Sequence, residues 1–152
     1  LLRAEKGYII VGQDTDGTVT PLDLNLNWMI GKKKKDFIGK RSLIRSDIVR
    51  ENRKQLVGLV PINKTYGIEE GQHVIEKESL SLPIKKPVEM LGHVTSSYFS
   101  PTLKHSVAMA LIKGGKRKIG SRLYVSTSNF NTIPVEVVDT SFIDPKNERM
   151  ML

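Results

Sequence analysis

The residues best suited to chemistry lie at the start of the chain, where charged side chains alternate with apolar ones. Arg3 and Glu5 stand two residues apart, before an apolar run from Tyr8 to Val11. On a β-strand, residues two apart share a face, so this pair could form a charged wall of an anion or pterin site. A structural ion pair or a surface position is the simpler interpretation, and the residues alone favour it.

The next carboxylates, Asp14 and Asp16, belong to the string D-T-D-G. Two carboxylates at this spacing could perform acid–base chemistry or bind a hard cation. The string is similar to the start of a calcium-binding loop, but such a loop needs Glu at its twelfth position, where Asn25 stands. Asp side chains also close turns by accepting hydrogen bonds from nearby backbone, so we expect a turn at residues 14–17.

Histidines, serines and basic strings elsewhere fit no known catalytic motif. The residues concerned are His73, His93, His105, Ser96, Ser97, Ser100, the run Lys32 to Lys35 and the string K-G-G-K-R-K-I-G at residues 113–120. The histidine spacing matches no short metal motif, and G-x-S-x-G is absent. The basic string lacks Walker spacing, so we interpret it as a hairpin turn. The lysine run predicts a solvated loop.

The composition limits the possible partners. The 152 residues carry 39% hydrophobic residues, no Cys and a net charge of +8. The lack of Cys excludes disulfides and thiolate sites from this sequence and is consistent with the cytoplasm. No apolar run approaches the ~20 residues that span a bilayer. No nucleic-acid motif accompanies the basic charge, so we expect neither a nucleic-acid nor a membrane partner. The charge would equally suit an acidic subunit or an anionic ligand.

The elements that must position these residues differ between the two parts of the chain. Tyr8 to Val11 predicts a strand, Met29 to Gly31 predicts the end of another, and the apolar residues between Phe37 and Val49 predict the clearest helix. From residue 55 onward, short apolar runs alternate with turn signals and predict a small antiparallel barrel or sandwich. These runs cover residues 55–61, 73–76, 88–101, 106–112, 122–127 and 134–139.

Three blocks of the sequence resemble the glycine-cleavage T-protein (aminomethyltransferase) family. They are L-R-A-E-K-G-Y with G-Q-D-T-D-G-T-V-T-P and Trp28, then D-F-I-G-K-R-S-L, then G-H-V-T-S-S-Y-F-S-P-T-L-K-H-S-V-A-M-A-L-I. The resemblance implies an α+β, mainly β chain. Residues 1–53 would be the C-terminal remnant of a folate-binding domain, and residues 54–152 the C-terminal β-barrel domain.

Two details resemble one branch of this family, the α subunit of heterotetrameric sarcosine oxidase. They are Lys6 with the following G-Y-I-I-V-G-Q, and the ending P-V-E-V-V-D-T-S-F-I-D-P-K-N-E-R. The resemblance implies a complex that oxidatively demethylates sarcosine to glycine, forms hydrogen peroxide and passes the one-carbon unit to tetrahydrofolate. FAD, FMN and NAD would belong to that complex, and we do not expect them to bind this chain alone. The implied partners are the other sarcosine oxidase subunits.

For this chain the resemblance implies folate-binding residues but no catalytic or metal-binding ones. Tyr8 matches a position that can line the folate pocket, and Arg3 and Glu5 match residues that can brace the pocket wall. The resemblance also implies that the family's catalytic Asp lies upstream of Leu1. The chain begins without Met inside a dense sequence, so we expect it to be part of a longer protein. We therefore expect the chain to be inactive by itself. Lys104 stands where the family often has Gly, at a cost of about 1 kcal/mol if the turn needs a positive φ.

Two other functions stay open. The parent could be a stand-alone aminomethyltransferase or a related folate-dependent demethylase. The chain could also be a non-catalytic module that docks subunits. The run Lys32 to Lys35 could attract the glutamate tail of folate or simply face water.

Overall fold

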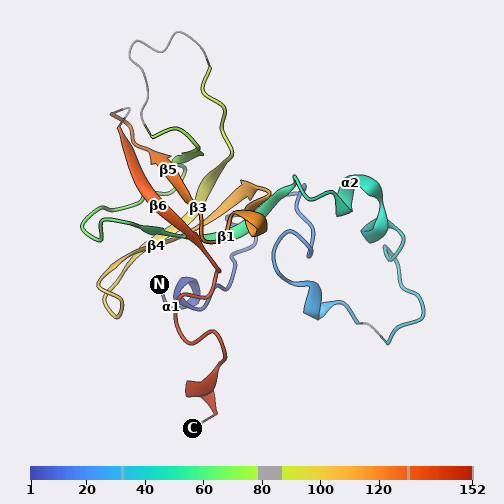
Figure 1. Cartoon of the computed structure of the whole chain (residues 1–152). Helices are drawn as coiled ribbons and strands as arrows, with labels where there is room; N and C mark the ends of the chain where they lie inside the picture. Colours follow the sequence, from blue (N-terminus) through green and yellow to red (C-terminus); the bar gives the residue numbers. More distant parts are fainter. Residues whose placement is uncertain (32, 79–86, 130, 152) are drawn as a thin grey trace.

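Six antiparallel strands form a closed barrel in the computed structural model, which describes residues 1–31, 33–78, 87–129 and 131–151. They pair in the order β1-β4-β3-β2-β5-β6, and β6 closes onto β1 (Figure 1). The prediction of a small antiparallel barrel is confirmed, because every predicted run supplies one strand. The strands are β1 (Lys54–Pro61), β2 (His73–Ile75), β3 (Gly92–Ser100), β4 (His105–Lys113), β5 (Arg122–Ser126) and β6 (Thr132–Val138).

Alternating side chains separate the inside of the barrel from its outside. Val57 and Leu59 of β1 belong to the interior cluster, whereas Leu56, which precedes Val57, belongs to a second cluster on the outer surface. Glu136 is exposed between buried Val135 and Val137, as the sequence of β6 predicted. Successive side chains of a strand point to opposite faces of the sheet, so every second side chain enters the barrel and contributes to its aliphatic core.

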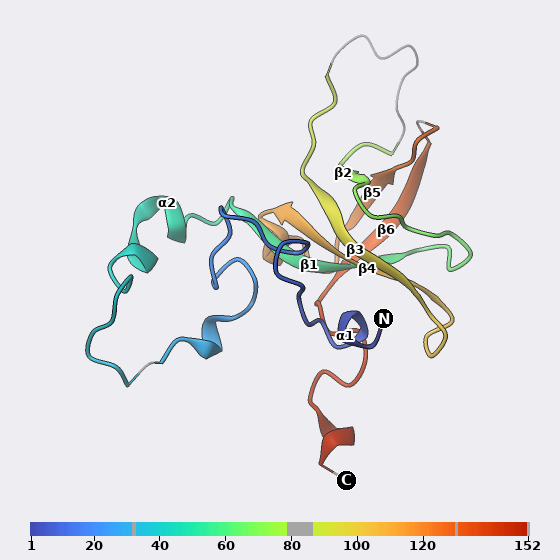
Figure 2. The same ribbon diagram turned by 180° about the vertical axis from the view of Figure 1, so that it is seen from behind.

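The N-terminal segment covers the outer face of β1, β3 and β4 (Figure 2). It begins with the short helix α1 (Leu2–Glu5), from which Ala4 is buried. Ala4 and Leu24 pack against Leu56, Met109 and Leu111 on the barrel surface. β4 is therefore buried on both faces, which explains why its apolar run shows no polar alternation.

The chain after β6 returns to α1 across the barrel surface. The backbone N–H groups of Phe142 and Ile143 donate to the carbonyl oxygen of Glu5, at 2.9 and 3.0 Å. Gly58 permits this crossing, because a Cβ there would lie 2.4 Å from the carbonyl oxygen of Asp139. The tail then ends in η4 (Glu148–Met150).

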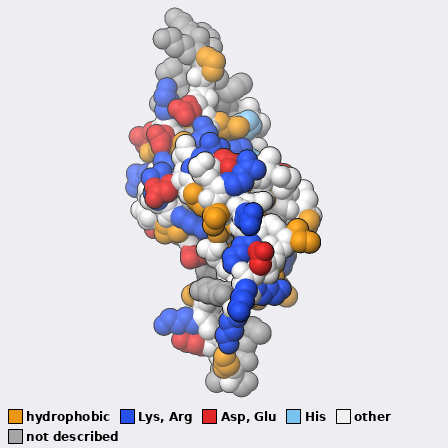
Figure 3. Space-filling view, turned by 90° about the vertical axis from the view of Figure 1, so that its right-hand side faces the viewer, with side chains coloured by type: hydrophobic (Ala, Val, Ile, Leu, Met, Phe, Trp, Pro, Cys, Tyr) orange, Lys and Arg blue, Asp and Glu red, His pale blue; other side chains and the backbone are white. Residues whose placement is uncertain are grey.

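Residues 27–50 form an arm that stands away from the barrel (Figures 1 and 2), and Figure 3 views the molecule from the side of this arm. It contains η1 (Asn27–Met29), η2 (Ser42–Ile44) and α2 (Ser46–Val49). The prediction of one clear helix here is wrong, because Gly39 takes a left-handed φ of +92°. None of the described residues of the arm is buried, so packing does not stabilise a longer helix.

The two strands predicted before residue 55 are also wrong. The N–H of Tyr8 donates to the carbonyl of Arg3 (2.8 Å), and the N–H of Asp14 donates to the carbonyl of Ile10 (2.9 Å). These local bonds form turns and leave no strand at Tyr8 to Val11. Met29 is the last residue of the 3-10 helix η1, and Ile30 after it forms a bend, so no strand ends at Met29 to Gly31. Among the described residues, none of the helices has the length and apolar character needed to cross a membrane.

Candidate functional site

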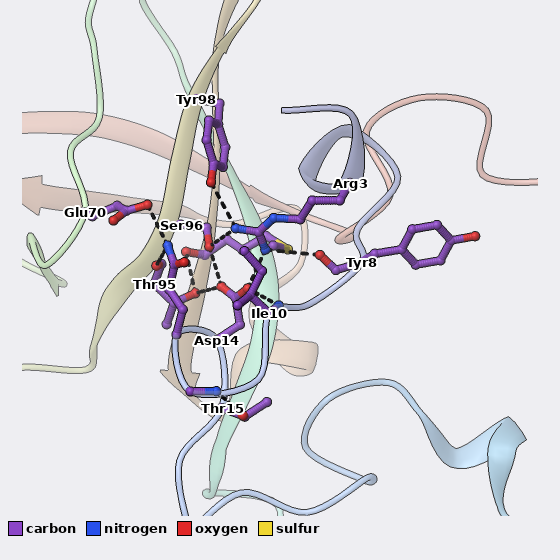
Figure 4. A network of polar contacts seen from close by, with 12 residues as sticks. Arg3, Tyr8, Ile10, Asp14, Thr15, Glu70, Thr95, Ser96 and Tyr98 are labelled. Atoms are coloured by element: carbon purple, nitrogen blue, oxygen red, sulfur yellow. Dashed lines mark hydrogen bonds and ion pairs between the residues drawn. The ribbon is translucent and has the colours of Figure 1, made fainter.

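Asp14 is the centre of a polar network between the N-terminal segment and β3 (Figure 4). Its carboxylate is fully buried. Oδ1 accepts hydrogen bonds from the hydroxyls of Thr95 (2.5 Å) and Ser96 (2.6 Å). Oδ2 accepts the N–H of Ile10 (2.9 Å) and lies 2.5 Å from Nη1 of Arg3. The turn predicted here therefore places one of its carboxylates inside the protein.

The surroundings of Asp14 keep it ionised. Burial alone would raise the pKa of Asp14, but the hydrogen bonds from Ser96, Thr95, the N–H of Ile10 and Arg3 outweigh burial and lower this pKa. A carboxylate stabilised in this way is a poor proton donor at neutral pH. The contacts make Asp14 a structural anion that orders its neighbours.

Arg3 is fixed on several sides by the same network. Its Nη1 also donates to the carbonyl oxygen of Tyr8 (3.1 Å), and Nη2 donates to the hydroxyls of Ser96 (2.7 Å) and Tyr98 (3.2 Å). The guanidinium carbon lies 5.5 Å from the centre of the Tyr98 ring, within cation–π range. Its Nε is buried and has no partner among the described residues. Arg3 thus joins three segments and has little capacity left for an anionic ligand.

Glu5 makes separate contacts, so Arg3 and Glu5 do not share one face of a strand, the arrangement that a charged wall of this pair would require. α1 is helical, and residues two apart on a helix point in different directions. The Glu5 side chain is buried, and its Oε1 accepts the hydroxyl of Ser100 (2.6 Å). That hydroxyl in turn accepts the N–H of Leu103 (3.0 Å). Glu5 therefore anchors α1 to the turn between β3 and β4.

Tyr8 differs from the other two predicted site residues because it is 59% exposed. Its ring projects away from the network, while its carbonyl oxygen is held by Arg3 (Figure 4). The backbone of Tyr8 is thus fixed and its side chain is accessible. Of the three predicted residues, Tyr8 is the one whose side chain is free to contact a ligand.

The remaining candidates have ordinary structural roles. Oδ1 of Asp16 accepts the N–H and the hydroxyl of Thr18, which lowers the pKa of Asp16 and confirms an Asx-type turn. His73 and His93 are paired residues of β2 and β3. Within the described part of the chain, no group of three or more His, Asp or Glu side chains could hold a metal ion. The basic string after β4 contains η3 (Gly115–Lys118) and leads to β5; these strands are not neighbours, so the predicted hairpin is wrong.

Sequence reasoning missed the partners of Asp14. Thr95 and Ser96 are consecutive, yet both hydroxyls reach the same carboxylate oxygen. The register of β3 against β4 shifts between Val94 and Ser96, and this bulge accounts for the shared direction. The one sequence signal for a role of Thr95 and Ser96 was that both lie in the third of the three blocks that resemble the T-protein family.

Known proteins resemble this chain over nearly its whole length. Sarcosine oxidase subunit alpha from Corynebacterium sp. (strain U-96) is 43% identical over 149 residues, which are 98% of this chain and 15% of that subunit. The Rhizobium meliloti subunit alpha is 32% identical over 151 residues, again 15% of its length. Aminomethyltransferase from Halothermothrix orenii is 34% identical over 142 residues, 93% of this chain and 36% of the relative.

A solved structure and a domain family agree with the fold. Aminomethyltransferase T of the glycine cleavage system from Bartonella henselae superposes with a TM-score of 0.76 at 25% identity, over 95% of this chain and 37% of that one. The profile of the glycine cleavage T-protein C-terminal barrel domain matches residues 54–144, which include all six strands. The chain therefore belongs to the family of glycine cleavage T-protein C-terminal barrel domains.

Proposed function

We propose that this chain is the C-terminal part of a sarcosine oxidase α subunit. The observation that carries the proposal is its identity of 43% and 44% to two such subunits over 98% of the chain. The proposed complex converts sarcosine, dioxygen and tetrahydrofolate into glycine, hydrogen peroxide and 5,10-methylenetetrahydrofolate. FAD, FMN and NAD belong to other parts of that complex. This chain contributes to the folate site and is inactive alone.

Tyr8 is the proposed folate contact. An exposed aromatic ring with a phenol can stack on a pterin and exchange a hydrogen bond with it. Arg3 and Asp14 act as positioning residues, because the buried pair holds the carbonyl oxygen of Tyr8. Glu5 braces α1 through Ser100. The part of the site described in this chain is thus one wall of a pocket completed elsewhere in the parent.

We propose two domains with a boundary between residues 53 and 54. Residues 1–53 belong to the folate-binding domain, although residues 1–26 pack on the barrel, and residues 54–152 form the barrel domain. The start of the family match at residue 54 supports this boundary. We place the complex in the cytoplasm, consistent with a sequence without Cys.

The full-length protein with its partner subunits provides the test. We expect sarcosine-dependent formation of hydrogen peroxide, and a fall in released formaldehyde when tetrahydrofolate is added. Tyr8→Ala should raise the KM for tetrahydrofolate at least about tenfold, because stacking and a hydrogen bond are lost. Peroxide formation without folate should not change.

Tyr66→Ala is the matched control, since Tyr66 is also exposed, at 48%, but lies on the loop after β1. Its KM for tetrahydrofolate should match that of the wild type. An equal effect of both variants would contradict the role of Tyr8. A full-length protein without sarcosine-dependent peroxide formation would contradict the proposed reaction itself.

A second candidate function is transfer of an aminomethyl group to tetrahydrofolate without oxidation. The identity of 34% to an aminomethyltransferase and the superposition on aminomethyltransferase T favour it. A parent that exchanges the one-carbon unit with folate but produces no peroxide would establish this alternative.

A further inference from the structure

A groove of about 580 Å³ lies over the outer face of β2, and none of its described lining residues belongs to the N-terminal segment that forms the candidate site. Val74 of β2 belongs to the barrel interior, so Ile75 next to it points outward. Ile75 is only 3% exposed, although neither core cluster of the described residues contains it. Together with Val88 and Met90 it forms an apolar floor. The volume of the groove suits a small ligand.

Hydrogen bonds to neighbouring strands fix the walls of this groove. On one side, the N–H of Gly71 donates to the carbonyl oxygen of Val94 (2.9 Å), and Gly71 takes a left-handed φ of +78° there. On the other side, the N–H of Leu91 donates to the carbonyl oxygen of Val74 (2.9 Å), which holds Met90 beside β2. The groove is therefore formed before any ligand binds, and binding does not require these walls to become ordered.

The charged side chains of the groove are acidic. Glu69 and Glu70 are exposed at its rim, and no Lys or Arg is among the described residues that line it. Oε1 of Glu70 accepts the side-chain amide of Gln13 (2.7 Å), which also donates to the carbonyl oxygen of Thr95 (3.1 Å; Figure 4). The position of the Glu70 carboxylate is thus fixed. The net charge of the chain is +8, so the groove is an acidic hollow in a basic protein.

We propose that this groove binds a primary alkylammonium ligand, with the charged head at the two Glu residues and the alkyl body on the apolar floor. The three N–H donors of a primary ammonium group form charge-assisted hydrogen bonds with carboxylates. The floor adds affinity with each methylene group that it removes from water. The inference goes beyond the proposed function, because this ligand is neither sarcosine nor folate.

Other classes of ligand fit the groove less well. Folate and sarcosine carry carboxylates, which Glu69 and Glu70 would repel. A metal ion would lack ligands, since the described residues contain no group of three or more His, Asp or Glu side chains that could hold one. A quaternary ammonium group is typically bound by aromatic rings, and none of the described lining residues is aromatic. A primary ammonium group with an alkyl chain matches both the rim and the floor.

Methyl NMR of the full-length protein tests the proposal with hexylamine, which is protonated at pH 7. The methyl signal of Met90, assigned with Met90→Leu, should shift and saturate. Hexylamine should bind at least about tenfold more tightly than hexanol, because the alcohol has no charge to pair with the carboxylates. Hexanoate should not bind. From butylamine to hexylamine, affinity should rise about threefold with each methylene group.

Two double variants of the full-length protein identify the groups that recognise the ammonium. E69Q/E70Q should lower the affinity for hexylamine at least about tenfold and leave the affinity for hexanol unchanged. The unchanged affinity for hexanol would also show that the groove keeps its shape. E136Q/E148Q is the matched control, because it removes the same charge from two exposed Glu residues outside the groove. Its affinity for hexylamine should equal that of the wild type.

Three outcomes would overturn the proposal. Equal affinities for hexylamine and hexanol would show that the groove recognises apolar bodies alone. Equal losses in E69Q/E70Q and E136Q/E148Q would show that the ammonium group responds to the charge of the whole protein. A Met90 signal that no probe shifts would show that the groove is closed or already filled in the full-length protein. These measurements are independent of peroxide formation, so a failure here differs from a failure of the proposed reaction.

Discussion

The ammonium group of Lys6 is bound to Asp144 near the other end of the chain. Its Nζ donates to the carbonyl oxygen of Asp144 at 2.6 Å and lies 3.5 Å from Oδ2 of that residue. It also donates to Oδ1 of Asn147 at 2.7 Å. Lys6 and the F-I-D-P ending are two features that resemble sarcosine oxidase α subunits, and the fold brings them into contact.

Replacing Lys6 should loosen the tail. Lys6→Met removes a charged donor from both acceptors, so we expect a loss of about 1–2 kcal/mol in the free energy of unfolding. Trypsin should cleave faster after Lys146, as mass spectrometry can measure. Lys77→Met, at an exposed position after β2, is the control. Equal cleavage rates in the two variants would show that Lys6 does not hold the tail.

Gly58 should tolerate no side chain. A Cβ at Gly58 would lie 2.4 Å from the carbonyl oxygen of Asp139 and 2.9 Å from the Phe142 ring, so backbone must move. We expect Gly58→Ala to destabilise the fold by about 2–3 kcal/mol in urea unfolding. Gly67→Ala is the matched control, because a Cβ there would meet nothing within 4 Å. Similar losses for both variants would point to an effect on the unfolded chain instead.

The barrel could be predicted from the sequence because each of its strands carries its own signal. Alternation such as V-E-V in β6 and the turn residues between runs depend on local chemistry alone. The arm could not be predicted in the same way. Its apolar residues follow a helical spacing, but Gly39 adopts a left-handed conformation and the described barrel offers these residues no packing surface. A segment whose apolar residues follow a helical spacing forms a stable helix only where those residues pack against another surface.

The candidate site was only partly predictable for a similar reason. The sequence marks Arg3, Glu5 and Tyr8 as candidates, but it does not predict the pairing of Arg3 with Asp14, two residues that a turn brings together. Asp14 accepts hydrogen bonds from the hydroxyls of both Thr95 and Ser96, and this arrangement depends on a bulge in β3. Bulges and long-range ion pairs arise from tertiary contacts, and a residue pattern contains no direct signal for them.

Lys104 occupies a turn position suited to glycine. Its φ is +60°, which is the condition under which a Lys at this position costs about 1 kcal/mol. Lys104→Gly should stabilise the fold by about 0.5–1 kcal/mol, because relief of backbone strain exceeds the added entropy of the unfolded chain. Lys64→Gly, at a loop residue without positive φ, should be neutral or destabilising. Thermal unfolding of both variants measures the difference in their stability. A loss of stability in Lys104→Gly would contradict the presence of backbone strain at Lys104.

Asp14 should link stability to pH. We expect Asp14→Asn to cost about 3 kcal/mol at pH 7, since it leaves the partly buried Arg3 without its counter-charge. The pKa of Asp14 is lowered in the folded state, so its contribution is present above the unfolded pKa, near 4, and is lost as pH falls through the folded value. The difference between wild type and variant in urea unfolding should therefore shrink in strong acid. Asp47→Asn, which removes an exposed pair, should cost less than about 0.5 kcal/mol at any pH. A constant difference for Asp14→Asn down to the lowest pH would mean that hydrogen-bond geometry, and not the charge of Asp14, stabilises this network.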